Sequence, residues 1–293
     1  FSTPDKPRFV AGDVGPTNKT CSMSPDVSNP AAREITYDEL FTDVCEQVDG
    51  LIEGGADVIL IETIFDTLNC KAMIDAALTM MKKHGVELPV MISLTVSDLA
   101  GRTLSGQTVD AFLASLSPYP IFSVGMNCAF GAPQMKPFIE HMAQVAPYYI
   151  SAHPNAGLPN EMGEYDETAE SMAPQIAEFI DEGIVNIIGG CCGTSPEFIA
   201  HYARIAEGKK PHQVVEKPKY MWLSGLDLLQ VDDSVHLPVD ASRFVNVGER
   251  CNVAGSRKFL RLINEKKYEE AIGIARKQVA DGAAVVDVNM DDG

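Results

Sequence analysis

Six short apolar runs recur between residues 8 and 192, and their rhythm limits the fold more than any other feature of this sequence. Strands that are apolar along their whole length are typical of parallel sheets covered by helices. Intervals of roughly 30 residues leave room for one helix in each crossover. The runs are RFVAGDVG (8–15), DVILIETI (57–64), PVMISLTV (89–96), IFSVGMNC (121–128), YYISAHPN (148–155) and VNIIGGCC (185–192). The sequence therefore predicts an α/β fold built from six β/α units.

Two architectures combine parallel strands and helices in this way. A closed (β/α)8 barrel has eight units, and an open doubly wound sheet has fewer. No Gly-rich GxGxxG loop follows any of the six runs, which disfavours a dinucleotide-binding sheet. We therefore expect a (β/α)8 TIM-barrel fold, of which this chain holds most of one barrel, with two opening units before Phe1.

The rhythm stops after residue 207. Residues 208–242 begin with the basic, proline-containing GKKPHQVVEKPK and are predicted to form an interdomain linker. The strand-like RFVNVGERCN then opens a second β/α pattern, which continues through a helical segment (258–282) to AVVDVNMDDG. We assign residues 1–207 to a first barrel and residues 243–293 to the beginning of a second barrel.

The charge balance excludes some classes of partner. The chain has 41 acidic and 23 basic residues, a formal net charge of -18. This charge repels phosphate backbones and anionic membrane surfaces, so we expect neither nucleic acid nor a membrane as partner. No apolar stretch reaches the roughly 18 to 20 residues of a membrane span, and the first residues lack a signal-peptide pattern. We expect a cytoplasmic protein whose seven cysteines stay reduced.

Three cysteines lie where predicted strands end. Cys191 and Cys192 stand side by side in IIGGCCGTSP, and Cys128 closes the run IFSVGMNC. In a parallel barrel these strand ends share the face that carries active sites, so the three thiols would gather there. Three thiolates bind zinc and leave a fourth position for an exchangeable ligand. The alternative is that Cys191 and Cys192 are small residues in a tight turn, which the flanking glycines allow to bend.

Two parts of the chain resemble a known enzyme family. The stretch GGCCGT (189–194), with NC (127–128) and LIET (60–63) upstream, resembles the homocysteine-binding barrel of cobalamin-dependent methionine synthases. Homocysteine methyltransferases that use betaine or S-methylmethionine share this thiol pattern. The segments RFVNVGERCNVAGSRKF and DGAAVVDVNMDDG resemble the start of the pterin-binding barrel that follows in methionine synthases. Single-barrel methyltransferases have no such continuation.

The resemblance implies a zinc-dependent methyl transfer to homocysteine that gives methionine. Zinc on Cys128, Cys191 and Cys192 would bind the homocysteine sulfur as a thiolate, which attacks methylcobalamin. Methyltetrahydrofolate on the second barrel would then remethylate the cobalamin, whose binding module lies outside this chain. The family's Gly-rich substrate loop belongs to the opening units, so we expect the 293-residue chain to be incomplete for activity.

The same resemblance implies roles for two more residues near these strand ends. Asn155 in HPNAG matches a weak fourth zinc ligand that substrate sulfur displaces, and its alternative is an Asn that satisfies backbone groups in a turn. Glu62 matches a carboxylate that binds the substrate ammonium, and its alternative is a cap on the following helix. Asp13 ends the run RFVAGDVG and faces the same rim, so it is a second candidate to bind the substrate, and its alternative is a turn-forming Asp.

In the second barrel, four residues at or just after strand ends are expected to contact the pterin. Carboxylate and amide groups match the donor edge of the pterin ring. The four are Glu249, Asn252, Asp287 and Asn289. Glu249, in a GER turn, has a purely structural alternative.

Three other interpretations of the thiols stay open. A single-barrel zinc homocysteine methyltransferase would take its methyl group from betaine or S-methylmethionine. A non-catalytic zinc protein would close the site with a fourth fixed protein ligand. A redox protein would use the vicinal thiols for electron transfer.

Overall fold

The structure is a computed structural model that describes residues 2–217, 221–231 and 245–291. The chain divides into two compact units, residues 1–229 and 230–293, which we describe separately. Among the described residues, no helix combines the length and the apolar character needed to cross a membrane.

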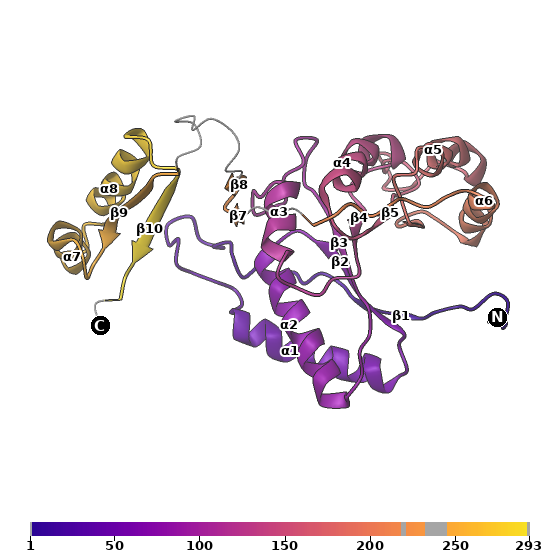
Figure 1. Ribbon diagram of the computed structural model, residues 1–293, viewed down its shortest axis with the longest axis horizontal. Coiled ribbons are helices and arrows are strands. Elements are labelled where there is room, and N and C mark those ends of the chain that lie inside the picture. The colour runs from indigo at the N-terminus through magenta and orange to yellow at the C-terminus, as the bar shows by residue number, and fades with distance from the viewer. Residues whose placement is uncertain (1, 218–220, 232–244, 292–293) are drawn as a thin grey trace. The chain divides into compact units, whose positions relative to one another are not determined.

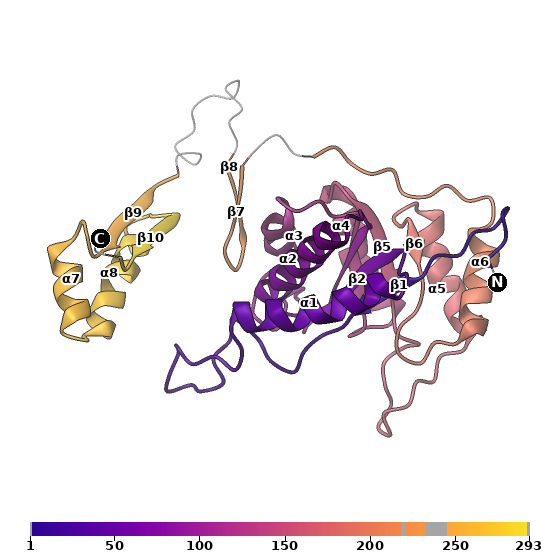
Figure 2. The same ribbon diagram turned by 90° about the horizontal axis from the view of Figure 1, so that it is seen from below.

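The first unit alternates strands and helices, as the six apolar runs predict (Figures 1 and 2). Six of its strands are parallel and form one sheet in the order β1-β2-β3-β4-β5-β6. A doubly wound sheet reverses its strand order, whereas a barrel keeps consecutive strands adjacent. The elements are β1 (Ala11–Val14), α1 (Tyr37–Glu53), β2 (Val58–Ile64), α2 (Thr67–His84), β3 (Val90–Leu94), α3 (Val109–Leu116), β4 (Ser123–Asn127), α4 (Ala132–Val145), β5 (Tyr149–His153), α5 (Ala169–Asp181), β6 (Ile187–Ile188) and α6 (Pro196–Ala206). The first unit is therefore an α/β fold consistent with a partial TIM barrel.

Local sequence signals mark where α1 and α2 begin. Thr36 and Glu39 form a capping box before α1, and Asp66 caps α2 by accepting hydrogen bonds from the N–H groups of Leu68 and Asn69. Such caps satisfy N–H groups that have no partner within the helix. These two caps fix where α1 and α2 begin, and so where the loops that follow β1 and β2 end.

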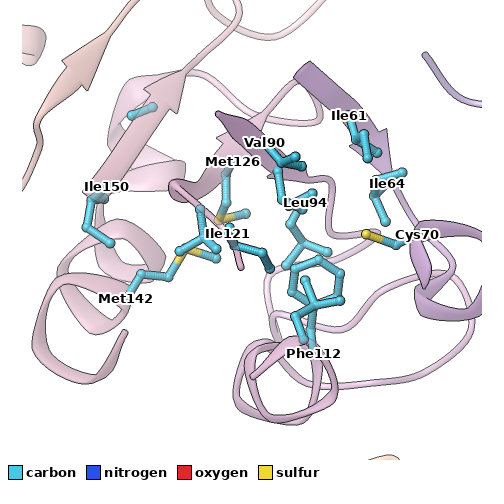
Figure 3. Packing of buried hydrophobic residues seen from close by; sticks show 14 of the residues in the cluster. Ile61, Ile64, Cys70, Val90, Leu94, Phe112, Ile121, Met126, Met142 and Ile150 are labelled. Atoms are coloured by element: carbon cyan, nitrogen blue, oxygen red, sulfur yellow. The ribbon is translucent and has the colours of Figure 1, made fainter. Parts of the chain in front are cut away.

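Apolar side chains from the strands pack against the helices. On the sheet, the buried side chains that face the helices include Ile61, Val90, Leu94, Met126 and Ile150. Figure 3 shows them beside Cys70, Phe112 and Met142, which come from α2, α3 and α4. Burial of these side chains supplies the main driving force that holds the helices on the sheet.

The opposite face of the central strands carries small and polar residues. Side chains alternate between the faces of a strand, so Ser93, Gly125, Asn127 and Ser151 share the face away from these helices. All four are buried. A Cβ at Gly125 would lie 1.8 Å from the Ser151 carbonyl oxygen, which explains why only glycine fits there. The close approach of β4 and β5 fixes the strand ends that carry Asn127 and Cys128.

Part of the predicted linker is an ordered hairpin of β7 (Met221–Ser224) and β8 (Leu228–Val231), labelled in Figure 2. Its tip packs on α3 and on the loop before α3. Thr108 N donates a 2.9 Å hydrogen bond to the Leu226 carbonyl, and Arg102 forms a 2.8 Å ion pair with Asp227. Residues 218–220 and 232–242 of the predicted linker lie outside the described residues, and the domain limits 1–207, 208–242 and 243–293 stay predictions.

The second unit contains a parallel pair of strands with two helices between them. Its elements are β9 (Val247–Asn252), α7 (Arg257–Asn264), α8 (Tyr268–Ala280) and β10 (Val285–Asn289). The sequence pattern predicted a helical segment over residues 258–282, and the structure divides it into two helices. The chain breaks at Glu265–Lys267, where Lys266 takes a positive φ of 57° that no helix interior allows. A small core that includes Phe259 and Leu262 holds the helices on the strands.

The contact between β4 and β5 can be tested by replacing Gly125 with alanine. The new methyl group would collide with backbone, which cannot move aside without shifting a strand, so we expect a loss of about 3 kcal/mol or more in the free energy of unfolding. Gly50→Ala in the exposed part of α1 is the matched control, because nothing lies within 4 Å of its new Cβ. This control should gain up to about 1 kcal/mol. Urea denaturation measures both, and a Gly125→Ala protein as stable as wild type would contradict the close contact.

Candidate metal centre

The structure brings three thiols together at the carboxyl ends of the strands. Cys128 follows β4 directly, and Cys191 and Cys192 follow β6. The sulfur of Cys128 lies 3.4 Å from that of Cys192 and 3.5 Å from that of Cys191. The sulfurs of Cys191 and Cys192 are 3.9 Å apart. The three sulfur atoms thus form a nearly regular triangle.

This triangle has the dimensions of one face of a tetrahedral zinc site. Zn–S bonds of about 2.3 Å hold neighbouring sulfurs about 3.8 Å apart. Three thiolates also bind zinc in preference to harder cations such as magnesium. Because Cys192 is exposed, the triangle is accessible to solvent and can admit a fourth ligand. The residues present therefore fit a zinc ion with an exchangeable position.

Strained backbone holds the first of these thiols. Cys128 and Ala129 have positive φ angles of 59° and 57°, a conformation that non-glycine residues rarely adopt. The Cys128 N–H donates to the His153 carbonyl at 3.3 Å, and Phe130 N donates to the Cys128 carbonyl at 2.6 Å. Strained residues of this kind concentrate at functional sites, where the surrounding structure enforces them.

The glycines around Cys191 and Cys192 serve two different needs. Gly193 has a φ of 79° and supplies the left-handed turn after the thiols. Gly189 supplies space, because a Cβ there would lie 2.5 Å from the ring of His153. The expectation that the glycines let the turn bend therefore applies to Gly193 and not to Gly189. Tyr165 packs on Gly193 and hydrogen-bonds the Cys192 sulfur.

The thiols differ in their tendency to ionise. The hydrogen bond with Cys128 lowers the pKa of Cys191, against the effect of burial. The hydrogen bond to Cys191 and burial both raise the pKa of Cys128. The neighbouring sulfurs thus favour ionisation of Cys191, and the thiolate is the form that binds metal ions.

Asn127 connects the thiols to Glu62, and sequence reasoning used it only as part of the NC motif. Its Nδ2 lies 3.1 Å from Glu62 Oε2, 2.7 Å from Thr63 Oγ1 and 3.8 Å from the Cys191 sulfur. Its Oδ1 accepts hydrogen bonds from Ser93 Oγ and Thr63 N. The sequence signal that could have identified Asn127 is an amide residue directly before Cys128, at the end of an apolar run.

Glu62 lies in β2, near the thiols and not on a helix. Asp66 caps α2, so the alternative that Glu62 caps this helix is wrong. Burial, Asp13 and Cys191 together raise the pKa of Glu62, in that order of effect. Burial also raises the pKa of Asp13, which lies in β1 and not in a turn. Among the described residues, no ion pair joins either of these two carboxyl groups to a basic side chain.

Asn155 lies beside the thiols and is buried. Its Oδ1 accepts a 3.1 Å hydrogen bond from the Cys192 N–H, and its own N–H donates to the Phe130 carbonyl. Asn155 therefore fastens the Cys192 turn to the Cys128 turn, which is the backbone role named as its alternative. Its part as a displaceable zinc ligand stays a prediction.

The residues expected to contact a pterin lie on the two strands of the second unit. Asn252 and Asn289 are paired in the register at the ends of β9 and β10, with Asn289 Nδ2 3.4 Å from Asn252 Oδ1. Glu249 and Asp287 lie inside these strands, so their expected placement at strand ends, and the GER turn, were wrong. Asn252 also accepts hydrogen bonds from Ala254 N and Gly255 N. Contact with a pterin stays a prediction for all four.

Comparison with known proteins supports both halves of this description. The family model for homocysteine S-methyltransferase matches residues 1–206, and that for pterin binding enzymes matches residues 248–293. The chain is also similar to two crystal structures of the Escherichia coli homocysteine methyltransferase MmuM, the apo and the metallated form. Sequence identities are 21% and 20%, with a TM-score of 0.50 for each.

The structural likeness covers 67% of this chain and 62% or 61% of the MmuM chains, so this chain spans about three fifths of their length. At this level of identity the likeness shows the fold alone. The family model, by contrast, covers well over half of the 293 residues and includes all three clustered cysteines. The chain belongs to the homocysteine S-methyltransferase family, and its homocysteine S-methyltransferase domain is followed by the start of a pterin-binding domain.

Proposed function

We propose that this chain carries the homocysteine site of a folate-dependent methionine synthase. The observation that carries the proposal is the triangle of Cys128, Cys191 and Cys192, with one side open to solvent. The site lies in a domain of the homocysteine S-methyltransferase family, and a pterin-binding domain begins after it. The reaction is methyl transfer to the sulfur of homocysteine, which gives methionine.

The three cysteines would hold a zinc ion in this proposal. When bound, zinc supplies a positive charge that favours the deprotonated form of the homocysteine thiol at neutral pH. The triangle is preformed, because strained backbone at Cys128 and the Gly193 turn fix its corners. Asn155 sets the Cys192 turn and would lend its amide oxygen as a weak ligand that the substrate displaces.

Glu62 and Asp13 would orient the substrate through its ammonium group. In homocysteine, three carbon atoms separate the sulfur from the amino nitrogen. Glu62 Oε2 and the Cys191 sulfur both lie within hydrogen-bonding distance of one nitrogen, that of Asn127, so a molecule of this size can reach both. A charge-assisted hydrogen bond to a half-buried carboxylate is stronger than one to a neutral group.

The methyl donor is the second part of the proposal. A pterin-binding domain directly after the homocysteine domain favours methyltetrahydrofolate over betaine or S-methylmethionine. Cobalamin would carry the methyl group between the two sites, bound by a module of the full-length enzyme outside this chain. Glu249, Asn252, Asp287 and Asn289 would contact the pterin.

We expect one zinc ion to bind per chain. Loss of this zinc is expected in each of the variants Cys128→Ser, Cys191→Ser and Cys192→Ser, because a site with two thiolates binds zinc far more weakly. Cys45→Ser is the matched control, since this cysteine lies on α1 away from the triangle. Elemental analysis after gel filtration measures the zinc content.

X-ray absorption then tests whether the bound zinc takes up substrate. Addition of homocysteine should add a sulfur to the zinc coordination sphere. Unchanged coordination would favour the non-catalytic zinc protein, and zinc-free protein with thiol-dependent electron transfer would favour the redox protein.

Homocysteine binding should depend on the ionisation of Glu62. The pKa of Glu62 is raised, so the carboxylate that attracts the ammonium is lost at a higher pH than for an ordinary glutamate. Affinity for homocysteine should therefore fall as the pH is lowered through this raised pKa. Glu62→Gln should weaken binding about tenfold near neutral pH and remove this dependence.

Calorimetry with zinc-loaded protein measures these affinities, and 4-mercaptobutanoate is the matched ligand because it keeps the thiol and lacks the amino group. The ratio of the two affinities cancels any effect of pH on the metal. A ratio that stays constant with pH in the wild-type chain would argue against Glu62 as the ammonium site.

A further inference from the structure

Asn127 has more hydrogen-bond acceptors around its amide nitrogen than it has N–H groups. Its Nδ2 carries two hydrogens but lies within reach of Thr63 Oγ1, Glu62 Oε2 and the Cys191 sulfur, at 2.7, 3.1 and 3.8 Å. Thr63 makes the shortest contact and takes one hydrogen. The Thr63 hydroxyl in turn hydrogen-bonds Glu62. Glu62 and Cys191 therefore compete for the second N–H of Asn127.

The orientation of this amide is fixed by the other partners. Asn127 Oδ1 accepts a 3.1 Å hydrogen bond from the backbone N–H of Thr63, which can only donate. Ser93 Oγ donates to the same oxygen at 2.6 Å. Asn127 is 1% exposed, so water does not compete for these groups. The amide cannot flip, and its nitrogen must face Glu62 and Cys191.

We propose that Asn127 is a positioning residue that shares one amide N–H between Glu62 and Cys191, and thereby couples binding of an ammonium group at Glu62 to the charge on the metal-bound sulfur. The inference rests on the proposed function, which places a metal on the three cysteines and the substrate ammonium on Glu62.

The coupling follows from the competition for this hydrogen. Without ligand, the carboxylate is the stronger acceptor and draws the N–H of Asn127 away from the sulfur. When an ammonium group satisfies Glu62, the N–H turns to Cys191. A hydrogen bond to a metal-bound thiolate withdraws charge from the sulfur, so the metal attracts the incoming thiolate more strongly. A thiol ligand without an amino group leaves the N–H of Asn127 on Glu62, so its attraction to the metal does not increase.

The charge on the sulfur can be measured by absorption spectroscopy with cobalt(II) in place of zinc. The thiolate-to-cobalt charge-transfer band moves to shorter wavelength when the sulfur accepts a hydrogen bond. In the wild-type chain, we expect the band with homocysteine at shorter wavelength than the band with 4-mercaptobutanoate. In Asn127→Leu, which removes the N–H and keeps the volume, the two bands should coincide. With homocysteine bound, loss of this contact should also weaken cobalt binding by about tenfold, the lower end for residues that support metal ligands.

Two further variants separate the coupling from a general disturbance of the site. Ser93→Ala removes a hydrogen bond to the oxygen of the same amide but leaves the shared N–H, so its bands should match those of wild type. Glu62→Gln weakens the competing acceptor, so the band of the ligand-free protein should move to shorter wavelength. This last variant tests the proposal even if Asn127→Leu fails to fold.

The outcomes distinguish this inference from the proposed function. A wild-type chain that binds no cobalt, or whose spectrum does not respond to homocysteine, contradicts the proposed function. If wild type responds but Asn127→Leu keeps the full difference between the two ligands, the coupling is wrong and the function stands. The coupling is also wrong if Ser93→Ala shifts the bands as much as Asn127→Leu, or if Glu62→Gln leaves the ligand-free band unmoved.

Discussion

The close contact between β4 and β5 is the constraint on which the site depends. The backbone and hydroxyl oxygens of Ser151 occupy the space that a side chain at position 125 would need. The same register places Asn127 beside His153 at the end of the sheet. The turns that carry Cys128 and Asn155 begin there, and a hydrogen bond from Asn155 N to the Phe130 carbonyl joins them. Gly125, in the middle of β4, thus controls the position of the Cys128 thiol after the end of that strand.

Strain collects where the strands end. Thr63, Cys128 and Ala129 all have positive φ angles and all belong to the network around Asn127 and the sulfur atoms. Each such residue costs about 1–3 kcal/mol, which the packed helices and the apolar layer must offset. In return the donors are held in place before any ligand binds. Ions and substrates then meet a site that needs little rearrangement.

The strands and the clustering of the thiols could be predicted because they follow from regular patterns. Apolar runs far enough apart for one helix each predicted all six parallel strands, and parallel strands necessarily end on one face. The role of Asn127 could not be predicted, because it depends on which side chains its amide meets across β2 and β3. The break at Lys266 was missed because helical periodicity continues through it, and Glu249 was placed in a turn because glycine and charge suggested one. In each case tertiary contacts decided between conformations that the local sequence allows.

The β7–β8 hairpin differs from the rest of the first unit in the sequence distance of its partners. The β/α units contact their neighbours along the chain, whereas Asp227 pairs with Arg102 and Ser224 with Ser115, separations of 125 and 109 residues. Closing loops of this length has a larger entropic cost than closing a single β/α unit. The hairpin also cannot dock before α3 has formed, because Ser224 donates to the Ala111 carbonyl of that helix. During synthesis on the ribosome, therefore, the loop from Arg102 to Thr108 stays without these partners until the chain has been made to beyond residue 227, and the order of translation sets when it is secured.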